Sequence, residues 1–310
     1  MLRSLFIALS ANRPLRRFSE RSSLGRRLAG RFVAGTSLED ALRAAAEVNA
    51  QDMAVSLDSL GESVTTEAEA RSAADLYHQL LDLIHARGLD DRTAYRDTNI
   101  SLKLTAMGLD ISPALCEHIV GELVAHAARL HSFVRIDMES SAYTEATLAL
   151  TERLHAQHPG RVGTVLQAYL YRTADDTERL LRQGIRIRLC KGAYKEPPTV
   201  AFPAKADVDA SYIRLMQRMA ASGVFCGLAT HDEAIVDTML RCVREQGIAP
   251  SAFEFQMLFG VRRDLQRRLV HAGFGVRVYI PFGTAWYPYF MRRLAERPAN
   301  VLFLARNLFR

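Results

Sequence analysis

Cysteine is scarce in this 310-residue sequence, and the four cysteines lie far apart. Cys116, Cys190, Cys226 and Cys242 form no CxxC pair, so neither a disulfide framework nor a zinc ribbon is indicated. The sequence also lacks an apolar run of the ~18 residues that a membrane-spanning helix requires. These absences favour reduced thiols in a cytosolic setting and argue against an integral membrane protein.

Signatures of nucleotide and metal binding are missing as well. No GxGxxG motif follows an expected strand, since the stretch that begins at Gly273 lacks the third glycine, and no P-loop is present. A metallohydrolase barrel requires a histidine cluster such as HxH near its first strand. His155 and His158 share one face of an expected helix end before Pro159, a place typical of surface histidines. We therefore expect no metal site.

The net charge of the chain is +6, and its pI is near 9.3. Such a balance favours anionic partners in general and does not distinguish nucleic acid, anionic lipid and small anions. No Lys/Arg cluster with interleaved aromatic residues lies outside the first thirty residues, so we expect no nucleic-acid partner.

The first 31 residues have a composition of their own. They are rich in arginine and serine, with Glu20 as the only acid, which overlaps with mitochondrial transit peptides. Leu2, Leu5, Phe6 and Leu9 also recur at helical spacing, as in a basic amphipathic helix on a membrane surface. We favour a retained segment and a cytoplasmic protein that can associate peripherally with the inner face of the cell membrane. A mitochondrial matrix location is the alternative.

Short apolar runs alternate eight times with longer helical segments. The expected strands are Met53–Leu60, Ile100–Met107, Phe133–Met138, Val162–Tyr169, Ile185–Cys190, Val224–Thr230, Phe253–Phe259 and Val276–Pro281. The expected helices are Thr66–Arg87, Pro113–Leu130, Glu145–Gln157, Ala174–Gln183, Asp207–Ala221, Glu233–Glu245, Arg262–His271 and Trp286–Ala295. This alternation predicts a (β/α)8 barrel over residues 51–310. Residues 1–50 form a basic N-terminal extension in this interpretation, with a helix that begins at Thr36 or Ser37.

Seven of the expected strands carry a polar side chain within or directly after an apolar run. These residues are Lys103, Asp137, Gln167, Arg188, Lys191, His231, Gln256 and Tyr279. A buried charge is costly unless it is paired or contacts a ligand. The active sites of such barrels lie at the carboxyl ends of the strands, so the pattern predicts a polar pocket there.

The last expected helix carries a cationic face. Tyr289, Arg292, Arg293 and Glu296 follow one another at i, i+3, i+4 and i+7 and therefore share one side of the helix. Adjacent guanidinium groups can each present a planar fork to one carboxylate. This face suits the capture of a small carboxylic acid, although an RR pair alone is typical of a solvated surface.

Two lysines leave a second enzyme class open. Lys103 and Lys191 lie in or directly after strands, where a desolvated lysine can act as the nucleophile of a Schiff-base aldolase. Against this, Gly192 and Ala193 follow Lys191 directly, and small residues at a strand end let a flat or phosphorylated ligand approach the backbone. A non-enzymatic scaffold attached to a membrane by its basic N-terminus is a third option, but it leaves the polar strand ends unexplained.

Six motifs in order give the chain a specific resemblance. SLDSLGE, SLKLTA, RLCKGAY, ATHDE, FEFQMLFG and YIPFG followed by YFMRRLAE resemble the proline dehydrogenases of the monofunctional bacterial type, over roughly residues 32–310. Cys190 departs from the family, which more often has valine there. The resemblance implies a distorted (β/α)8 barrel that binds FAD, oxidises L-proline to Δ1-pyrroline-5-carboxylate and passes electrons to a membrane quinone.

The resemblance also implies roles for single residues. Asp137 and Arg188 match catalytic positions, with Arg188 toward the flavin. The positions that match flavin contacts are Met138, Gln167, Arg188, Lys191, Gly192, Ala193, Thr230 and His231. Those that match the proline site are Lys103, Leu258, Tyr279, Tyr289, Arg292 and Arg293, with Glu62 and Glu296 closing or orienting the last helix.

Each of these assignments has a structural alternative. Asp137 and Arg188 can form an ion pair without a chemical role, and Lys103 can extend from a strand end to solvent. Tyr279 and Tyr289 can be core aromatics. A lone strand histidine such as His231 is often a satisfied core residue, Met138 would contribute through its backbone, and Gly192 can be required by the turn alone.

Overall fold

A computed structural model describes residues 29–91 and 96–296, with side chains through residue 291 in the last helix. The eight strands form one closed barrel in chain order, in which every neighbouring pair is parallel. The strands are β1 (Ala54–Ser59), β2 (Thr98–Leu102), β3 (Val134–Ile136), β4 (Val162–Gln167), β5 (Arg186–Cys190), β6 (Cys226–Ala229), β7 (Phe253–Leu258) and β8 (Gly275–Phe282). The predicted (β/α)8 barrel is confirmed.

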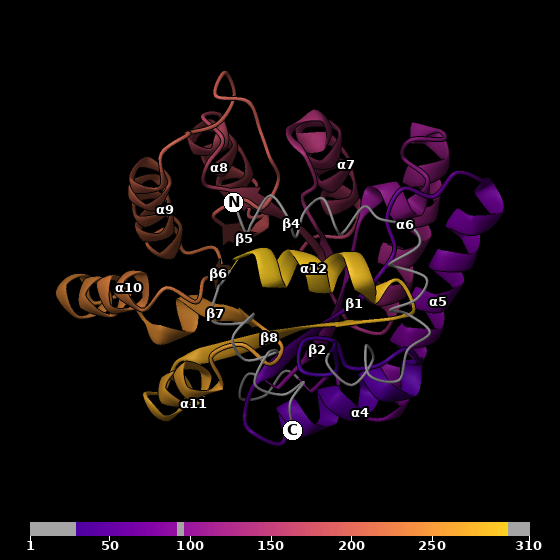
Figure 1. Cartoon of the computed structure of the whole chain (residues 1–310), viewed down its shortest axis with the longest axis horizontal. Helices are drawn as coiled ribbons and strands as arrows, with labels where there is room; N and C mark the ends of the chain where they lie inside the picture. Colours follow the sequence, from indigo (N-terminus) through magenta and orange to yellow (C-terminus); the bar gives the residue numbers. More distant parts are fainter. Residues whose placement is uncertain (1–28, 92–95, 297–310) are drawn as a thin grey trace.

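Helices surround the barrel as the sequence pattern predicts (Figure 1). They are α4 (Leu38–Asn49), α5 (Glu67–Ala86), α6 (Pro113–Arg129), α7 (Thr144–Gln157), α8 (Thr173–Arg182), α9 (Lys205–Ala220), α10 (Glu233–Gln246), α11 (Arg263–His271) and α12 (Trp286–Glu296). Each of these helices from α5 onward lies within two residues of its expected boundaries. Within the described part of the chain, no helix combines the length and the apolar character that crossing a bilayer requires.

One expected strand is too long. The run Ile100–Met107 continues as β2 only to Leu102, and Leu104–Met107 then form a short 3₁₀ helix (η2) that ends at Gly108 with φ 86°. An apolar run alone does not distinguish a strand from a buried helical turn, so the expected boundary at Met107 was wrong.

The strands alternate apolar side chains outward with polar side chains inward. In β1, Val55 and Leu57 join the apolar core beneath the helices, whereas the Ser56 hydroxyl bonds to Asn99 and Ser101 of β2 inside the barrel. The barrel interior is therefore polar, and the side chains inside it must form hydrogen bonds with one another. This arrangement explains why polar residues occur at alternate positions of apolar strands.

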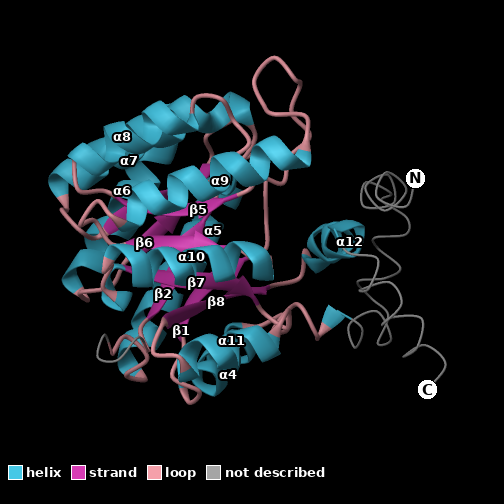
Figure 2. Ribbon diagram, turned by 90° about the vertical axis from the view of Figure 1, so that its left-hand side faces the viewer, coloured by secondary structure: helices cyan, strands magenta, loops and turns pink. Residues whose placement is uncertain are grey.

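Two helices depart from the regular pattern. Ser37 caps α4 and forms a capping box with Asp40, and α4 packs against β1 and β8 on the outside, where the barrel closes. The helix that follows β8, α12, instead lies across the carboxyl end of the barrel (Figures 1 and 2). The last helix, α12, therefore covers the carboxyl end of the barrel, and α4 packs on the outside of β8 and β1, where a helix after β8 would otherwise lie.

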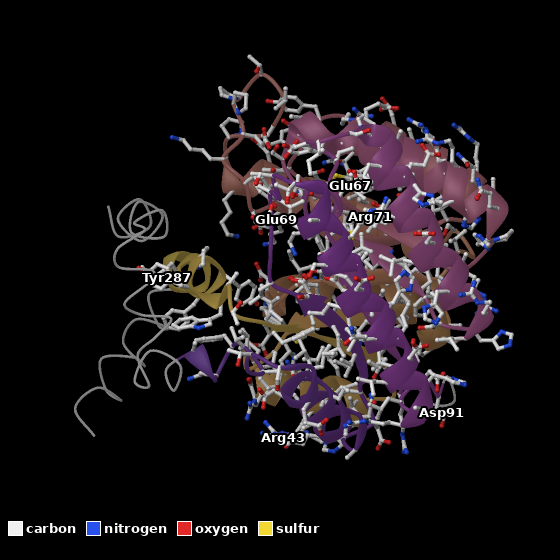
Figure 3. The ribbon with its side chains drawn as sticks, turned by 90° about the vertical axis from the view of Figure 1, so that its right-hand side faces the viewer. Arg43, Glu67, Glu69, Arg71, Asp91 and Tyr287 are labelled. Atoms are coloured by element: carbon white, nitrogen blue, oxygen red, sulfur yellow. The ribbon has the colours of Figure 1, made fainter. Side chains whose placement is uncertain are left out.

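The described part of α12 packs in an apolar cluster that is separate from the barrel core. Trp286, Tyr287 and Phe290 of α12 contact Phe32 and its neighbours near the start of the described chain. Figure 3 shows Tyr287 on α12 at one end of the barrel, with Glu67, Glu69 and Arg71 at the start of α5 nearer to it than Asp91. The end of the barrel that α12 covers is the carboxyl end of the strands, where the predicted pocket should lie.

Candidate active site

A cavity of about 520 Å³ opens at the carboxyl ends of the strands. Every predicted site residue whose side chain the structure describes lines it: Glu62, Lys103, Asp137, Met138, Gln167, Arg188, Lys191, Gly192, Ala193, Thr230, His231, Leu258, Tyr279 and Tyr289. The side chains of Arg292, Arg293 and Glu296 lie outside the described residues. The polar strand ends and the family resemblance together therefore identified residues that the fold brings to one place.

Arg188 of β5 lies at the floor of this cavity and is only 7% exposed. Its Nε donates to Gln256 Oε1 (2.5 Å), and one terminal nitrogen donates to Asp137 Oδ1 (2.7 Å). The other terminal nitrogen donates to the hydroxyl groups of Ser56 (3.2 Å) and Ser101 (3.3 Å). Four acceptors, from β1, β2 and β7 and from the residue that follows β3, thus hold the guanidinium plane in one orientation.

Asp137 joins this arginine to a tyrosine. Its second oxygen, Oδ2, accepts a hydrogen bond from the Tyr279 hydroxyl (2.7 Å), and the Arg188 guanidinium lies 5.2 Å from the centre of the Tyr279 ring. Enclosure, followed by the negative charge of Asp137, raises the pKa of Tyr279 well above its usual value. The phenol therefore remains a hydrogen-bond donor throughout the neutral range.

Lys103 is paired with a residue that the sequence analysis did not single out. Its Nζ donates to both carboxylate oxygens of Asp58 at 3.0 Å and lies 3.9 Å from Asp137. Burial by itself lowers the pKa of Lys103, but the charges of Asp58 and then Asp137 outweigh it and raise the pKa above that of a free lysine. Asp58 is an acid in the apolar run of β1, the same signal that identified the other residues.

Lys191 is also held between carboxylates that were missed. Its Nζ lies 2.5 Å from Asp209 of α9 and 3.0 Å from Asp232, the residue before α10. A Schiff-base nucleophile must be a neutral amine, and neither lysine has the apolar or cationic surroundings that favour one. The geometry therefore disfavours the aldolase alternative.

His231 and Gln167 have fixed orientations in the cavity wall. His231 Nε2 accepts a hydrogen bond from the backbone N–H of Leu258 (2.9 Å), which leaves Nδ1 as the protonated nitrogen of the neutral ring. The Gln167 amide nitrogen donates to the Glu139 carbonyl (3.1 Å), but its oxygen is buried and accepts no hydrogen bond among the described residues. A buried acceptor without a donor indicates a place for a ligand N–H group.

Gly192 adopts a backbone conformation that L side chains rarely accept. Its φ is 115°, and a Cβ atom there would lie 2.4 Å from the Tyr169 ring. Glycine is thus required both by the turn after β5 and by the packing of Tyr169 beneath it. The small residue leaves the backbone at this strand end open to the cavity.

The chain is similar to known enzymes over most of its length. The chain matches the sequence model of the family described as Proline dehydrogenase over residues 41–306. It is 38% identical to Proline dehydrogenase 1 of Bacillus subtilis (strain 168) over 311 residues, which is 100% of both chains. It is 40% identical to Proline dehydrogenase of Deinococcus radiodurans over 287 residues, 91% of this chain and 90% of the relative.

Solved structures share the fold. The structure of proline utilization A (PutA) from Bdellovibrio bacteriovorus inactivated by N-propargylglycine has a TM-score of 0.81 at 24% identity and covers 88% of this chain and 33% of that chain. PutA from Bradyrhizobium japonicum (mutant D778Y) has a TM-score of 0.75 at 25% identity, over 88% of this chain and 31% of that one. The extent of the family match and the full-length identity to curated relatives show that the chain belongs to the proline dehydrogenase family.

Proposed function

We propose that the protein oxidises L-proline to Δ1-pyrroline-5-carboxylate with FAD as cofactor and a membrane quinone as final acceptor. The observation that carries the proposal is the buried Arg188 guanidinium, held in one orientation at the floor of a cavity in a member of this family. A fixed cation in a water-poor site stabilises negative charge that develops during a reaction.

The cavity residues fit a flavin. The unpaired oxygen of Gln167 suits the N–H of a flavin ring, and Lys191 and the open backbone at Gly192 suit a diphosphate. We assign Met138, Gln167, Arg188, Lys191, Gly192, Ala193, Thr230 and His231 to cofactor binding. FAD supplies a two-electron acceptor at N5, and Arg188 would stabilise the negative charge of the reduced ring, which raises its reduction potential.

We assign the substrate carboxylate to Lys103 together with Arg292 and Arg293, whose adjacent positions on α12 follow from helical spacing. Leu258, Tyr279 and Tyr289 form the walls for the pyrrolidine ring, and Glu62 and Glu296 close or orient the last helix. The cations that these three residues would supply recognise an amino-acid carboxylate in a way that an apolar wall would not.

The oxidation would break one C–H bond of the ring carbon next to nitrogen, and bound FAD would supply the acceptor for the hydride. The nitrogen lone pair forms the C=N bond, and the amine proton leaves to solvent before or during this step. Asp58 and Asp137, the carboxylates at the cavity floor, are both ion-paired, so we assign neither as the base. Asp137 instead orients Arg188 and Tyr279.

The proposed function predicts a yellow protein whose flavin absorbance is bleached by proline under anaerobic conditions. Pyrrolidine, which has the same ring without the carboxylate, is the matched control and should bleach the flavin far more slowly. A colourless protein that forms a borohydride-trapped adduct with a carbonyl substrate would instead establish the Schiff-base alternative. Reoxidation of the bleached flavin by a soluble quinone, faster than by oxygen, tests the proposed acceptor.

Gly192→Ala is expected to lower both thermal stability and flavin retention. A non-glycine residue at positive φ costs on the order of 1–3 kcal/mol, and the new Cβ would also press on the Tyr169 ring at 2.4 Å. Thermal unfolding and the flavin-to-protein absorbance ratio measure the two effects. Gly121→Ala in α6, where a Cβ meets only Leu154 at 3.7 Å, is the matched control and should not destabilise the protein. Full flavin content in Gly192→Ala would contradict the assignment of this backbone to the cofactor.

A further inference from the structure

A chain of buried polar side chains runs from the cavity floor toward the opposite end of the barrel. Arg188 donates to Gln256 (2.5 Å), and Gln256 donates to Glu254 (2.6 Å). Arg277 donates to the same Glu254 oxygen (2.7 Å) and to Asp97 (2.9 Å). Gln256, Glu254 and Arg277 are each at most 5% exposed. The orientation of the cavity arginine is therefore connected to groups that do not line the cavity.

The Gln256 amide has only one orientation that satisfies both neighbours. A guanidinium can only donate hydrogen bonds, and an ionised carboxylate can only accept them. The amide must therefore direct its oxygen toward Arg188 and its nitrogen toward Glu254, as the structure has it. Glu254, fixed in turn by Arg277, thus determines which end of the amide meets Arg188.

Gly227 provides the space in which this amide lies. Gly227 lies on β6, between Arg188 of β5 and Glu254 of β7 in the strand register. The Gln256 side chain therefore passes over Gly227 on its way from β7 to Arg188. A Cβ atom at Gly227 would lie 2.3 Å from the Gln256 amide nitrogen and 2.7 Å from its Cδ. Any side chain at position 227 would displace the amide.

The neutrality of Gln256 has an electrostatic consequence. Asp137 is the only carboxylate among the described residues that bonds to Arg188, and it shares its charge with Tyr279. A glutamate at position 256 would place a second carboxylate on Arg188 and a like charge beside Glu254. An amide holds the guanidinium without cancelling its positive charge.

We propose that Gln256 is a positioning residue for the oxidation, which orients Arg188 through its Nε without adding a second carboxylate beside Asp137, and that Glu254 fixes the amide of Gln256. This inference rests on the proposed function, because it takes Arg188 as the group that stabilises the reduced cofactor. It extends the active-site apparatus to Glu254 and Gly227, neither of which lines the cavity.

Gln256→Met tests the hydrogen bond with little change in volume. The kcat should fall about tenfold or more, because Arg188 loses the charge-assisted hydrogen bond that orients its Nε. The KM for proline should change by less than about threefold, since uniform substrate binding is untouched. Glu254→Gln and Gly227→Ala should lower kcat in the same direction, the first by freeing the amide to rotate and the second by displacing it.

Gln256→Glu tests the charge. It should shift the flavin midpoint potential to a more negative value than either the wild type or Gln256→Met, because an added carboxylate disfavours the anionic reduced ring. Gln266→Met is the matched control: this glutamine of α11 is also 4% exposed, but its amide donates only to the backbone carbonyls of Val261 and Leu258. It should lower thermal stability and leave the potential unchanged.

Each outcome has a distinct meaning. If proline fails to bleach the flavin of the wild type, the proposed function is wrong, and the role of Gln256 in the oxidation is overturned with it. If the wild type turns over and Gln256→Met keeps its kcat and potential, the proposed function stands and the role of Gln256 is overturned. If Gln256→Met does not fold, the kcat and potential of Glu254→Gln decide, and wild-type values there would also overturn the proposal.

Discussion

Arg188→Met is expected to lower kcat for proline oxidation by about two to three orders of magnitude, the effect of removing one donor to a developing negative charge. The guanidinium makes four side-chain hydrogen bonds at the cavity floor, and methionine replaces none of them. The flavin midpoint potential should become more negative, because the cation that stabilises the reduced ring is lost. Stopped-flow reduction by proline and a spectroelectrochemical titration measure the two changes.

Arg188→Lys separates charge from geometry. An ammonium keeps the positive charge but lacks the planar group that donates to Asp137 and Gln256 at the same time. Compared with Arg188→Met, this variant should therefore restore more of the flavin midpoint potential than of the kcat. Arg135→Met is the control: Arg135 is 4% exposed, donates to backbone carbonyls inside the barrel and does not line the cavity. A flavin-loaded Arg188→Met enzyme with wild-type kcat would reduce the Arg188–Asp137 contact to a structural ion pair.

The barrel could be predicted from the sequence because both faces of its strands have a recognisable pattern. Outward positions such as Leu57 pack under helices and are apolar, whereas inward positions such as Ser56 face a polar interior. The position of α12 could not be predicted, since helical spacing defines which residues share a face but not what that face covers. The outer face of β8 and β1, where α12 could have packed, is covered by α4, a helix from the N-terminal part of the chain.

The candidate site was predictable where one unusual residue interrupts a strand and less so where partners come from elsewhere. Lys103 and Arg188 are conspicuous in apolar runs, but Asp209 lies in an ordinary amphipathic helix and meets Lys191 only in three dimensions. Asp58 was missed for another reason: its partner Lys103 lies two residues beyond Ser101, the residue that pairs with Asp58 in the register of β1 and β2. Partner assignment requires strand register, which spacing does not supply.

Lys103→Met is expected to destabilise the protein by about 3–5 kcal/mol at neutral pH, the cost of breaking a buried ion pair from one side. Asp58 is 1% exposed and loses its only cation among the described residues within 4 Å. The Tyr77 hydroxyl, 3.5 Å from Asp58, replaces little of that interaction. Urea denaturation of the wild type and the variant measures the difference in the free energy of unfolding.

The deficit of Lys103→Met should shrink as pH falls. Burial raises the pKa of Asp58, and Lys103 opposes that effect, so without the lysine the folded protein binds a proton more readily than the unfolded chain does. Protonation then removes the uncompensated charge, and stability is regained below the raised pKa. A deficit that grows on acidification would contradict this account.

The double variant Asp58→Asn with Lys103→Met separates the structural role of the lysine from its proposed role in substrate binding. Stability at neutral pH should return close to that of the wild type, because a buried amide requires no cation. The KM for proline should remain raised by about ten- to hundredfold in both variants if Lys103 holds the substrate carboxylate, since a charge-assisted hydrogen bond is lost in each. A stable double variant with wild-type KM would instead leave the carboxylate to the arginines of α12 and make Lys103 the counter-ion of Asp58 alone.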